Sequence, residues 1–222
     1  MIPIPFHKER ATALLGSDIV YPDVLTIGHT NHPIEQFFGL LAASSVTTVI
    51  DVRSSAASRW NRQFEKGALE ASCPHAGLDY RWAGKFLGGR PAESSLIVDG
   101  IASYEAMART ENFARGISRV KELAAVARPV LMCSERDPLD CHRCLLVSRR
   151  LIADGLSVSH IAFDGAVEAH GDAERRLLQS VEKRRGGKKV LMEAADPLDA
   201  AYKFQARRIA WRPKDDLDGE AR

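Results

Sequence analysis

The amino-acid sequence predicts an α/β fold in which helices flank a mostly parallel sheet, followed by a helical C-terminal extension. Apolar segments of strand type alternate with segments of helical periodicity from Val24 to Phe163. Residues 46–52 and 129–133 are also rich in apolar or β-branched side chains, as in strands that are buried on both faces. Such alternation is typical of Rossmann-like sheets, whose parallel strands are linked by helices.

Five strands are predicted, each as a short apolar or β-branched run bounded by polar or glycine-containing segments. They cover residues 24–28, 46–52, 78–82, 129–133 and 158–163, the third being the most mixed in character. Because helical segments separate consecutive strands, we expect the strands to run parallel.

Helices are predicted where apolar residues recur at intervals of three or four. Residues 34–41 show this spacing, and Asn31 is placed to cap that helix. A later helix is expected to start at Pro138, directly after Asp137, and to stop before Gly155. The predicted helices cover residues 33–43, 65–75, 103–127 (as one or two helices), 138–154, 172–185 and 197–211.

A chain of 222 residues suits one domain of about 150–180 residues and an extension. We divide it into an N-terminal arm (1–22), an α/β domain (23–165) and a basic helical C-terminal extension (166–222). The composition, 45% hydrophobic and 27% charged, is that of an ordinary globular protein. The net charge of +2 identifies no partner, although seven Lys or Arg against one Glu lie between Arg175 and Lys189.

The expected location follows from sequence features that the chain lacks. Four cysteines in a chain of this length give no disulfide framework. The first residues show no basic region followed by an apolar core, and no run of 18 apolar residues is long enough to span a membrane. We therefore expect a cytoplasmic protein without a membrane partner.

Most of the chemically active side chains lie in the polar segments that follow the strands. These segments are Gly28–Asn31, Asp51–Ser54, Gly84–Pro91 and Cys133–Arg143. Ligands of parallel sheets bind beyond the carboxyl ends of the strands, so we expect the four segments to form one site. The segments at the opposite edge are short and lack such side chains.

Five segments resemble the signature segments of domain-of-unknown-function family 488. They are residues 26–30, 49–53, 61–64, 87–90 and the cysteine-containing segment 133–143, within a likeness that runs from Val24 to Ile161. The resemblance implies a compact α/β fold with these residues at one edge, and it implies no particular reaction. Cys144 departs from the family pattern, which usually has a small residue such as Ser at that place.

A more distant likeness is to the rhodanese sulfurtransferases. It consists of Asp51-Val52-Arg53 after one strand and a strand–Cys–loop–Arg–helix order around Cys133 and Arg143. The loop between those two residues is longer than the rhodanese catalytic loop, so the likeness concerns the plan of the fold.

Four side chains are candidates for catalysis: Cys133, Glu135, Asp51 and His29. Cys133 ends a strand opposite a helix N-terminus, where a thiolate is favoured, although free cysteines are also common as buried apolar residues. Glu135 is either a base or a group that raises the pKa of the thiol. Asp51 and His29 would transfer protons, but Asp51 and Arg53 are equally suited to an internal ion pair.

The expected substrate- and anion-binding residues are Arg53, Arg62, Arg90, Cys141, His142 and Arg143. Guanidinium groups match the geometry of phosphate, and Arg62 near Trp60 suits a stacked nucleotide, with a solvated loop as the alternative. Successive helical positions diverge by about 100°, so residues 141–143 are not all expected to face the site.

No metal and no cofactor are assigned from the sequence. Cys133, Cys141 and His142 could together hold a metal ion, but the chain has no Cys-x-x-Cys pair and no evident fourth ligand. No Walker-type loop or Gly-x-Gly-x-x-Gly motif follows the first strand, which argues against standard ATP or dinucleotide cradles. Cys73 and Cys144 are assigned to packing.

The sequence therefore predicts an enzyme with an anion- or phosphate-binding pocket at the carboxyl edge of the sheet, acting on a nucleotide or nucleic-acid component. The expected partner is an anionic small molecule or nucleic acid, and the oligomeric state is unassigned. One alternative is a rhodanese-like thiol-dependent transferase with a reactive Cys133. The other is a non-catalytic nucleic-acid or protein-binding module that depends on the basic C-terminal extension.

Overall fold

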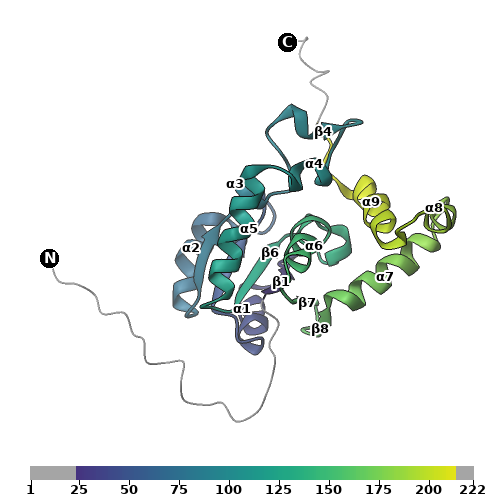
Figure 1. Ribbon diagram of the computed structural model, residues 1–222. Coiled ribbons are helices and arrows are strands. Elements are labelled where there is room, and N and C mark those ends of the chain that lie inside the picture. Colours follow the sequence, from purple (N-terminus) through teal and green to yellow (C-terminus); the bar gives the residue numbers. More distant parts are fainter. Residues whose placement is uncertain (1–23, 214–222) are drawn as a thin grey trace.

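The computed structural model describes residues 24–213, and a six-stranded sheet forms their centre (Figure 1). The strand order is β3-β2-β6-β1-β7-β8, in which only β8 is antiparallel to its neighbour among the described strands of this sheet. The predicted α/β fold with a mostly parallel sheet is confirmed, while the predicted arm, residues 1–22, lies outside the described residues. The strands are β1 (Val24–Gly28), β2 (Thr48–Asp51), β3 (Asp79–Trp82), β6 (Pro129–Cys133), β7 (Val158–Ile161) and β8 (Val167–Ala169).

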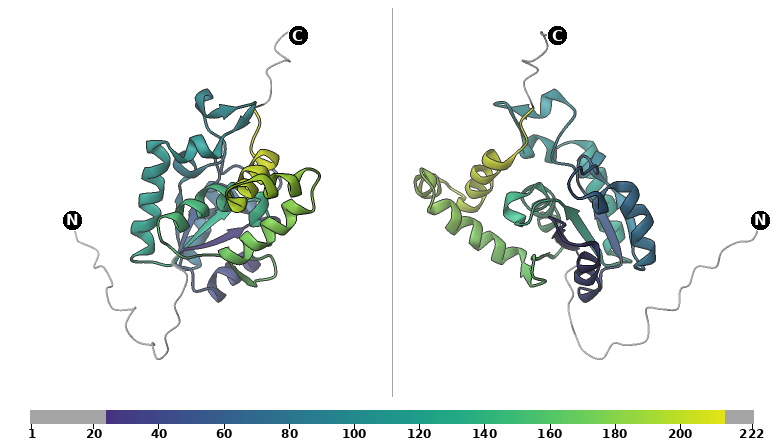
Figure 2. Two further views of the ribbon diagram at one scale, coloured as in Figure 1. Left: turned by 45° about the vertical axis from the view of Figure 1, so that its right-hand side comes forward. Right: turned by 180° about the vertical axis from the view of Figure 1, so that it is seen from behind.

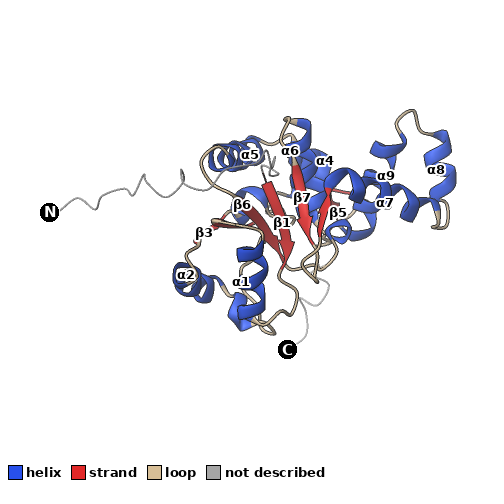
Figure 3. Ribbon diagram, turned by 90° about the horizontal axis from the view of Figure 1, so that it is seen from below, coloured by secondary structure: helices blue, strands red, loops and turns tan. Residues whose placement is uncertain are grey.

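Helices cover both faces of the sheet (Figure 3). Neighbouring strand residues point to opposite faces: Val49 packs in one buried cluster and Ile50 in the other. Both faces are therefore apolar, which is why the strands read as continuous apolar runs. The covering helices are α1 (Ile34–Ala43) and α2 (Lys66–His75) on one face, and α4 (Tyr104–Ala108), α5 (Glu111–Ala124) and α6 (Arg149–Ala153) on the other.

The strand register aligns the loops that follow the strands. Gly28 on β1 pairs with Cys133 on β6, and Asp51 on β2 pairs with Met132. Just beyond the strands, the amide of His29 donates to the carbonyl of Cys133 at 2.8 Å. The segments after β1, β2 and β6 thus leave the sheet side by side.

Two short elements lie in segments that were predicted as loops. The helix α3 (Gly84–Leu87) forms within the glycine-rich segment, and β4 (Ile97–Val98) pairs with β5 (Ile101–Ala102) in a hairpin. Asp99 and Gly100 at its tip both have positive φ, 52° and 73°, as a two-residue hairpin turn requires. The prediction missed the Asp-Gly signal because the two strands are only two residues long.

The helix predicted over residues 138–154 is broken into three pieces, which corrects the sequence analysis. A 3₁₀ turn, η3 (Pro138–Asp140), ends at Cys141, whose φ and ψ of −139° and 141° are extended. A π-helix, η4 (Arg143–Ser148), follows and continues into α6. The Ser148 hydroxyl donates to the Arg143 carbonyl oxygen at 2.7 Å. This bond gives a partner to a carbonyl that would accept from a backbone N–H in a regular α-helix.

The predicted cap of α1 is also wrong. The helix starts at Ile34, and Pro33 stands at the N-cap position without a side-chain hydrogen bond. Asn31 lies two residues before that position, and its side-chain oxygen instead accepts a hydrogen bond from the Thr30 hydroxyl at 2.9 Å.

The C-terminal extension packs beside the β7–β8 edge of the sheet (Figures 1 and 2). Its first strand, β8, was not predicted, and α8 begins where a break was expected. Leu177 and Tyr202 are buried in the same apolar cluster as Val158 of β7. No helix among the described residues is long and apolar enough to cross a membrane. The helices are α7 (His170–Glu182), α8 (Gly187–Glu193) and α9 (Pro197–Ile209).

Candidate functional site

Asp51 and Arg53 form a buried ion pair at the carboxyl end of β2. Arg53 Nε lies 2.9 Å from Asp51 Oδ1, and Nη2 lies 2.5 Å from Oδ2. The Tyr80 hydroxyl also donates to Oδ2, at 2.7 Å. The two side chains were open to two interpretations in the sequence, and here each is the main partner of the other.

His29 completes this group from the end of β1. Arg53 Nη1 lies 3.1 Å from His29 Nε2, and His29 Nδ1 donates to the Thr30 carbonyl at 2.9 Å. The imidazole stacks on the Phe64 ring, whose carbonyl oxygen accepts from Arg53 Nη2 at 2.7 Å. Burial and the adjacent Arg53 charge lower the pKa of His29 to about 4, so the imidazole is neutral near pH 7.

A second group gathers two thiols, an imidazole and a carboxylate at the end of β6. The Sγ atoms of Cys133 and Cys141 each lie 3.8 Å from His142 Nδ1. The other ring nitrogen of His142 donates to the Val52 carbonyl at 3.0 Å, which fixes the orientation of the ring. Glu135 Oε2 lies 3.0 Å from Cys141 Sγ. We call these four side chains, Cys133, Glu135, Cys141 and His142, the thiol cluster.

The two thiols of the thiol cluster differ in acidity. Burial, the hydrogen bond to Cys141 and the charge of Glu135 raise the pKa of Cys133 well above its usual value. Burial also opposes ionisation of Cys141, but the hydrogen bond from Cys133 and the charges of Arg143 and His142 hold its pKa well below the usual value. Any thiolate in this cluster is therefore carried by Cys141.

His142 and Glu135 respond to the same charge. Although burial disfavours the imidazolium, the Cys141 thiolate raises the pKa of His142. Burial and Cys141 likewise raise the pKa of Glu135. The backbone at Cys141 is extended rather than helical, and Cys141 and His142 both reach Cys133. In the continuous helix expected from the sequence, these two neighbouring side chains would point about 100° apart.

Arg143 is fully buried and supports the loop that carries Glu135. Its Nη1 donates to the Glu135 carbonyl at 2.6 Å, and its Nη2 to the Arg136 carbonyl at 3.1 Å. Its Nε is buried without a hydrogen-bond partner. Arg53 and Arg143 thus direct hydrogen bonds to protein acceptors, whereas Arg62 and Arg90 are exposed.

Glycines allow the surrounding loops to approach these groups closely. A Cβ on Gly28 would lie 1.9 Å from the Glu135 carbonyl oxygen, and one on Gly84 would lie 1.9 Å from that of Arg53. A Cβ on Gly89 would lie 2.7 Å from the His142 ring. Only glycine fits at these three positions without movement of the backbone or of the His142 ring.

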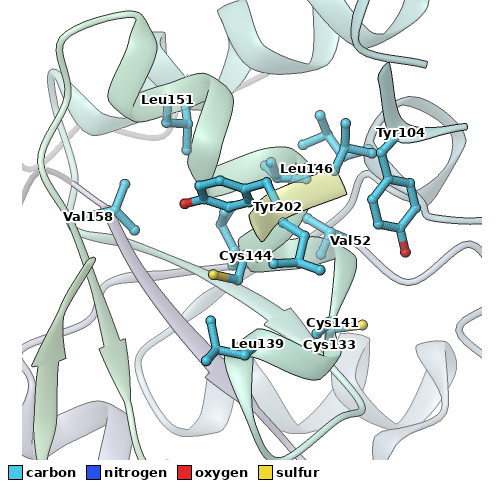
Figure 4. Close-up of a cluster of buried hydrophobic side chains, with 14 of the residues drawn as sticks. Val52, Tyr104, Cys133, Leu139, Cys141, Cys144, Leu146, Leu151, Val158 and Tyr202 are labelled. Atoms are coloured by element: carbon cyan, nitrogen blue, oxygen red, sulfur yellow. The ribbon is translucent and has the colours of Figure 1, made fainter. Parts of the chain in front are cut away.

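A cavity of about 530 Å³ lies between α4, α6 and α9. Tyr104 lines this cavity. In Figure 4 its ring lies on the same side of the cluster of buried hydrophobic side chains as the Cys141 sulfur. The wall combines apolar residues such as Leu145 with cations that include Arg149 and Lys203. The thiol cluster does not line this cavity.

A third polar group, in the core, was missed by the sequence analysis. Cys144, His160 and His170 place their Sγ and ring nitrogens within 4.8 Å of one another. Figure 4 shows Cys144 apart from Cys133 and Cys141, near the Tyr202 ring. No short motif marks the group, because its three residues come from η4, β7 and the start of α7.

The fold and the thiol cluster define an α/β protein in which cysteine and histidine side chains are buried together at the sheet edge. The family model for the domain of unknown function DUF488 matches residues 33–150, more than half of the chain. The chain therefore belongs to this family, and the matched segment contains the thiol cluster but neither His160 nor His170. No curated protein and no solved structure matches the chain, and the rhodanese likeness is not supported.

Proposed function

We propose that this protein is a thiol-dependent enzyme in which Cys141 is the nucleophile and the substrate is an anion. The observation that carries the proposal is the position of Cys141 Sγ, between an imidazole at 3.8 Å and a carboxylate at 3.0 Å. Arg143 and His142 favour the thiolate there, whereas Cys133 is held as the thiol. Cys141 thus takes the role that the sequence suggested for Cys133.

The other members of the thiol cluster have distinct roles in this proposal. His142, oriented by the Val52 carbonyl, stabilises the thiolate as an imidazolium. Glu135 is exposed as a whole residue, but its carboxyl group is largely buried where it reaches Cys141, so it can carry a proton between Cys141 and the substrate. With Glu135 protonated, Cys141, His142 and Arg143 together bear one net positive charge, which favours an anionic substrate.

Sulfur transfer from thiosulfate is the simplest reaction of this type. The Cys141 thiolate attacks the outer sulfur, a new S–S bond forms, and the S–S bond of thiosulfate breaks with its electron pair leaving on sulfite. The product is a persulfide on Cys141, and no external oxidant is needed. The Cys133 and Cys141 sulfurs lie within 4.8 Å of each other. After losing its proton, Cys133 can attack the outer sulfur of the persulfide, so that a new S–S bond forms on Cys133 and Cys141 leaves as the thiolate.

The pH dependence of thiolate ultraviolet absorbance tests the proposal without requiring a reagent to reach the buried sulfur. We expect the difference between wild type and Cys141→Ser to titrate below the free-thiol value of about 8.5. His142→Gln should raise that midpoint. Cys73→Ser is the control, because burial and Asp51 raise the pKa of Cys73 to about 11.

Two results would contradict the proposal. One is a Cys141 midpoint at or above the free-thiol value of about 8.5. The other concerns the sulfur-transfer step alone: mass spectrometry after incubation with thiosulfate should find one added sulfur on Cys141, and its absence would exclude thiosulfate as the donor.

Binding of a nucleotide or nucleic-acid component is a second candidate, favoured by one observation. The Trp60 side chain is 91% exposed, in the loop that also carries Arg62. Base stacking on such a ring contributes about 1–3 kcal/mol, so Trp60→Ala should weaken single-stranded oligonucleotide binding about 5- to 150-fold in anisotropy titrations. Val126→Ala, another exposed apolar residue, is the control. Equal affinity of the Trp60 variant and wild type would exclude this surface.

A further inference from the structure

We propose that Cys144, His160 and His170 form a binding site for a thiophilic transition-metal ion, with Zn²⁺ as the ion tested. The site is separate from the thiol cluster, and it does not depend on the proposed function. One thiol and two imidazoles are ligands that Zn²⁺ prefers in proteins. All three side chains are buried, and their potential ligand atoms lie within 4.8 Å of one another.

The distances between these atoms are close to those around a tetrahedral ion. Zn–S and Zn–N bonds of about 2.3 and 2.0–2.1 Å separate S from N by about 3.6 Å and two N atoms by about 3.3 Å. Cys144 Sγ lies 3.9 Å from His160 Nε2, and that nitrogen lies 3.0 Å from His170 Nδ1. Shifts of a few tenths of an ångström would bring these two pairs to the tetrahedral distances, and the ligand atoms of Cys144 and His170 lie within 4.8 Å of each other. A water molecule would take the fourth position.

The other nitrogen of each imidazole already has a side-chain partner. His160 Nδ1 lies 2.7 Å from the Thr26 hydroxyl, and His170 Nε2 lies 2.8 Å from the Tyr202 hydroxyl. The Tyr202 hydroxyl in turn donates to Glu174 at 2.9 Å. Metal-binding histidines characteristically have such partners, which fix the ring and the tautomer.

The same hydrogen bonds indicate which partner each of these polar groups has when no ion is bound. A consistent chain runs from the Thr26 hydroxyl through His160 and His170 to Tyr202, each group donating to the next. On binding of the ion, the His160 proton moves from Nε2 to Nδ1 and the Thr26 hydroxyl turns to accept it. Cys144 loses its proton to solvent, so one proton is released for each ion bound.

The backbone around Cys144 is also unusual. Cys144 lies in the π-helix η4, and π-helical turns occur frequently at functional sites. His170 begins α7 in the C-terminal extension, whereas Cys144 lies in the segment matched by the family model. A bound ion would therefore join the extension directly to the family domain.

The test uses the full chain, freed of metal with a chelator and titrated with Zn²⁺ and with Co²⁺. We expect Cys144→Ser to bind one ion per chain fewer than wild type. The thiolate-to-Co²⁺ charge-transfer band of wild type should also be lost in this variant. Cys141→Ser, in the thiol cluster, should retain both signals. Thr26→Val should weaken the affinity about 10–100-fold, the usual effect of removing a partner of a ligand. Calorimetry in buffers of different ionisation heat should give one proton released per ion.

Extended X-ray absorption fine structure of the Zn²⁺-loaded wild type tests the proposal without any variant. A first shell containing one sulfur and two imidazole nitrogens supports it. No binding by wild type, the same stoichiometry in Cys144→Ser, loss of the band only in Cys141→Ser, or a shell without sulfur would each overturn it. These outcomes leave the thiolate titration of Cys141 unaffected, so the two proposals fail separately.

Discussion

His29 illustrates how the partners of a residue decide its role. It was chosen from the sequence as a proton-transfer group because it follows a strand at the expected edge. Both ring nitrogens are occupied in the structure, one by Arg53 and one by the Thr30 carbonyl. Such a neutral, fully engaged imidazole is suited to positioning Arg53, and its low pKa makes it a source of pH-dependent stability.

We predict that the free energy of unfolding decreases as the pH falls from about 6.5 to about 4, in part because of His29. Its folded-state pKa of about 4 lies below the unfolded value of about 6.5, so the folded state binds fewer protons in this window. The contribution is complete above pH 6.5 and amounts to about 3 kcal/mol. Urea unfolding at several pH values should show a flatter profile in His29→Gln.

The control for this prediction is His75→Gln, because His75 lies at the exposed end of α2. That variant should keep the slope of the wild type. A His29→Gln profile parallel to that of the wild type would show that protonation of His29 does not oppose folding.

Residue types at the sheet edge could be predicted from the sequence, and the Asp51–Arg53 pair was one of two interpretations, but the partners of Arg143 could not be predicted. The strand ends placed Asp51, Arg53 and Cys133 together because parallel strands share a carboxyl edge. Arg143 was assigned to a ligand, whereas its donors reach backbone carbonyls. Arg53 was open to a ligand or to Asp51, and its donors reach Asp51 and the Phe64 carbonyl. The carbonyl acceptors are contributed by loop backbone, whose path depends on φ and ψ values that no side-chain pattern encodes.

At the scale of elements, glycine sets how closely α3 approaches the loop after β2. We predict that Gly84→Ala destabilises the protein by about 1–3 kcal/mol, since its Cβ would lie 1.9 Å from the Arg53 carbonyl oxygen. Gly39→Ala is the matched control: it lies in α1 with no neighbouring atom within 4 Å of the added Cβ. That change should stabilise the protein by about 0.5–1 kcal/mol. Urea unfolding of both variants measures the difference, and similar effects would show that the close approach is relaxed easily.

Helices and strands were predicted accurately where the interactions that form them are local in sequence, and less accurately where contacts with distant residues decide the backbone conformation. The bounds of β1 and β6 match the prediction, because an apolar run buried on both faces is recognisable from sequence alone. The helix predicted over residues 138–154 failed at Cys141, whose extended backbone accompanies contacts with Glu135 and Arg143. β8 was missed because three residues paired along one edge leave almost no periodicity.

At the scale of the whole molecule, the C-terminal extension shares its core with the α/β domain. Leu177 of α7 is fully buried in the same cluster as Val24 of β1 and Leu151 of α6. Arg176 adds a polar link to the α/β domain through a hydrogen bond to Asp137 at 2.7 Å, and it is also held by Glu168 of the extension at 2.9 Å. The shared core indicates that these parts fold as one cooperative unit, although the family match ends at residue 150.

We predict that Leu177→Ala lowers the stability of the entire described structure by about 2–5 kcal/mol, the usual cost of a cavity at a buried leucine. Native-state hydrogen exchange should then show faster exchange in the amides of β1 and β6, which Leu177 reaches only through the shared core. Val190→Ala on α8 is the control, since Val190 is 39% exposed. If the extension were an independent domain, exchange would accelerate in α7–α9 alone and the central strands would remain protected. Faster exchange in β1 and β6 requires that the chain outside the family match helps to stabilise the sheet that carries the thiol cluster.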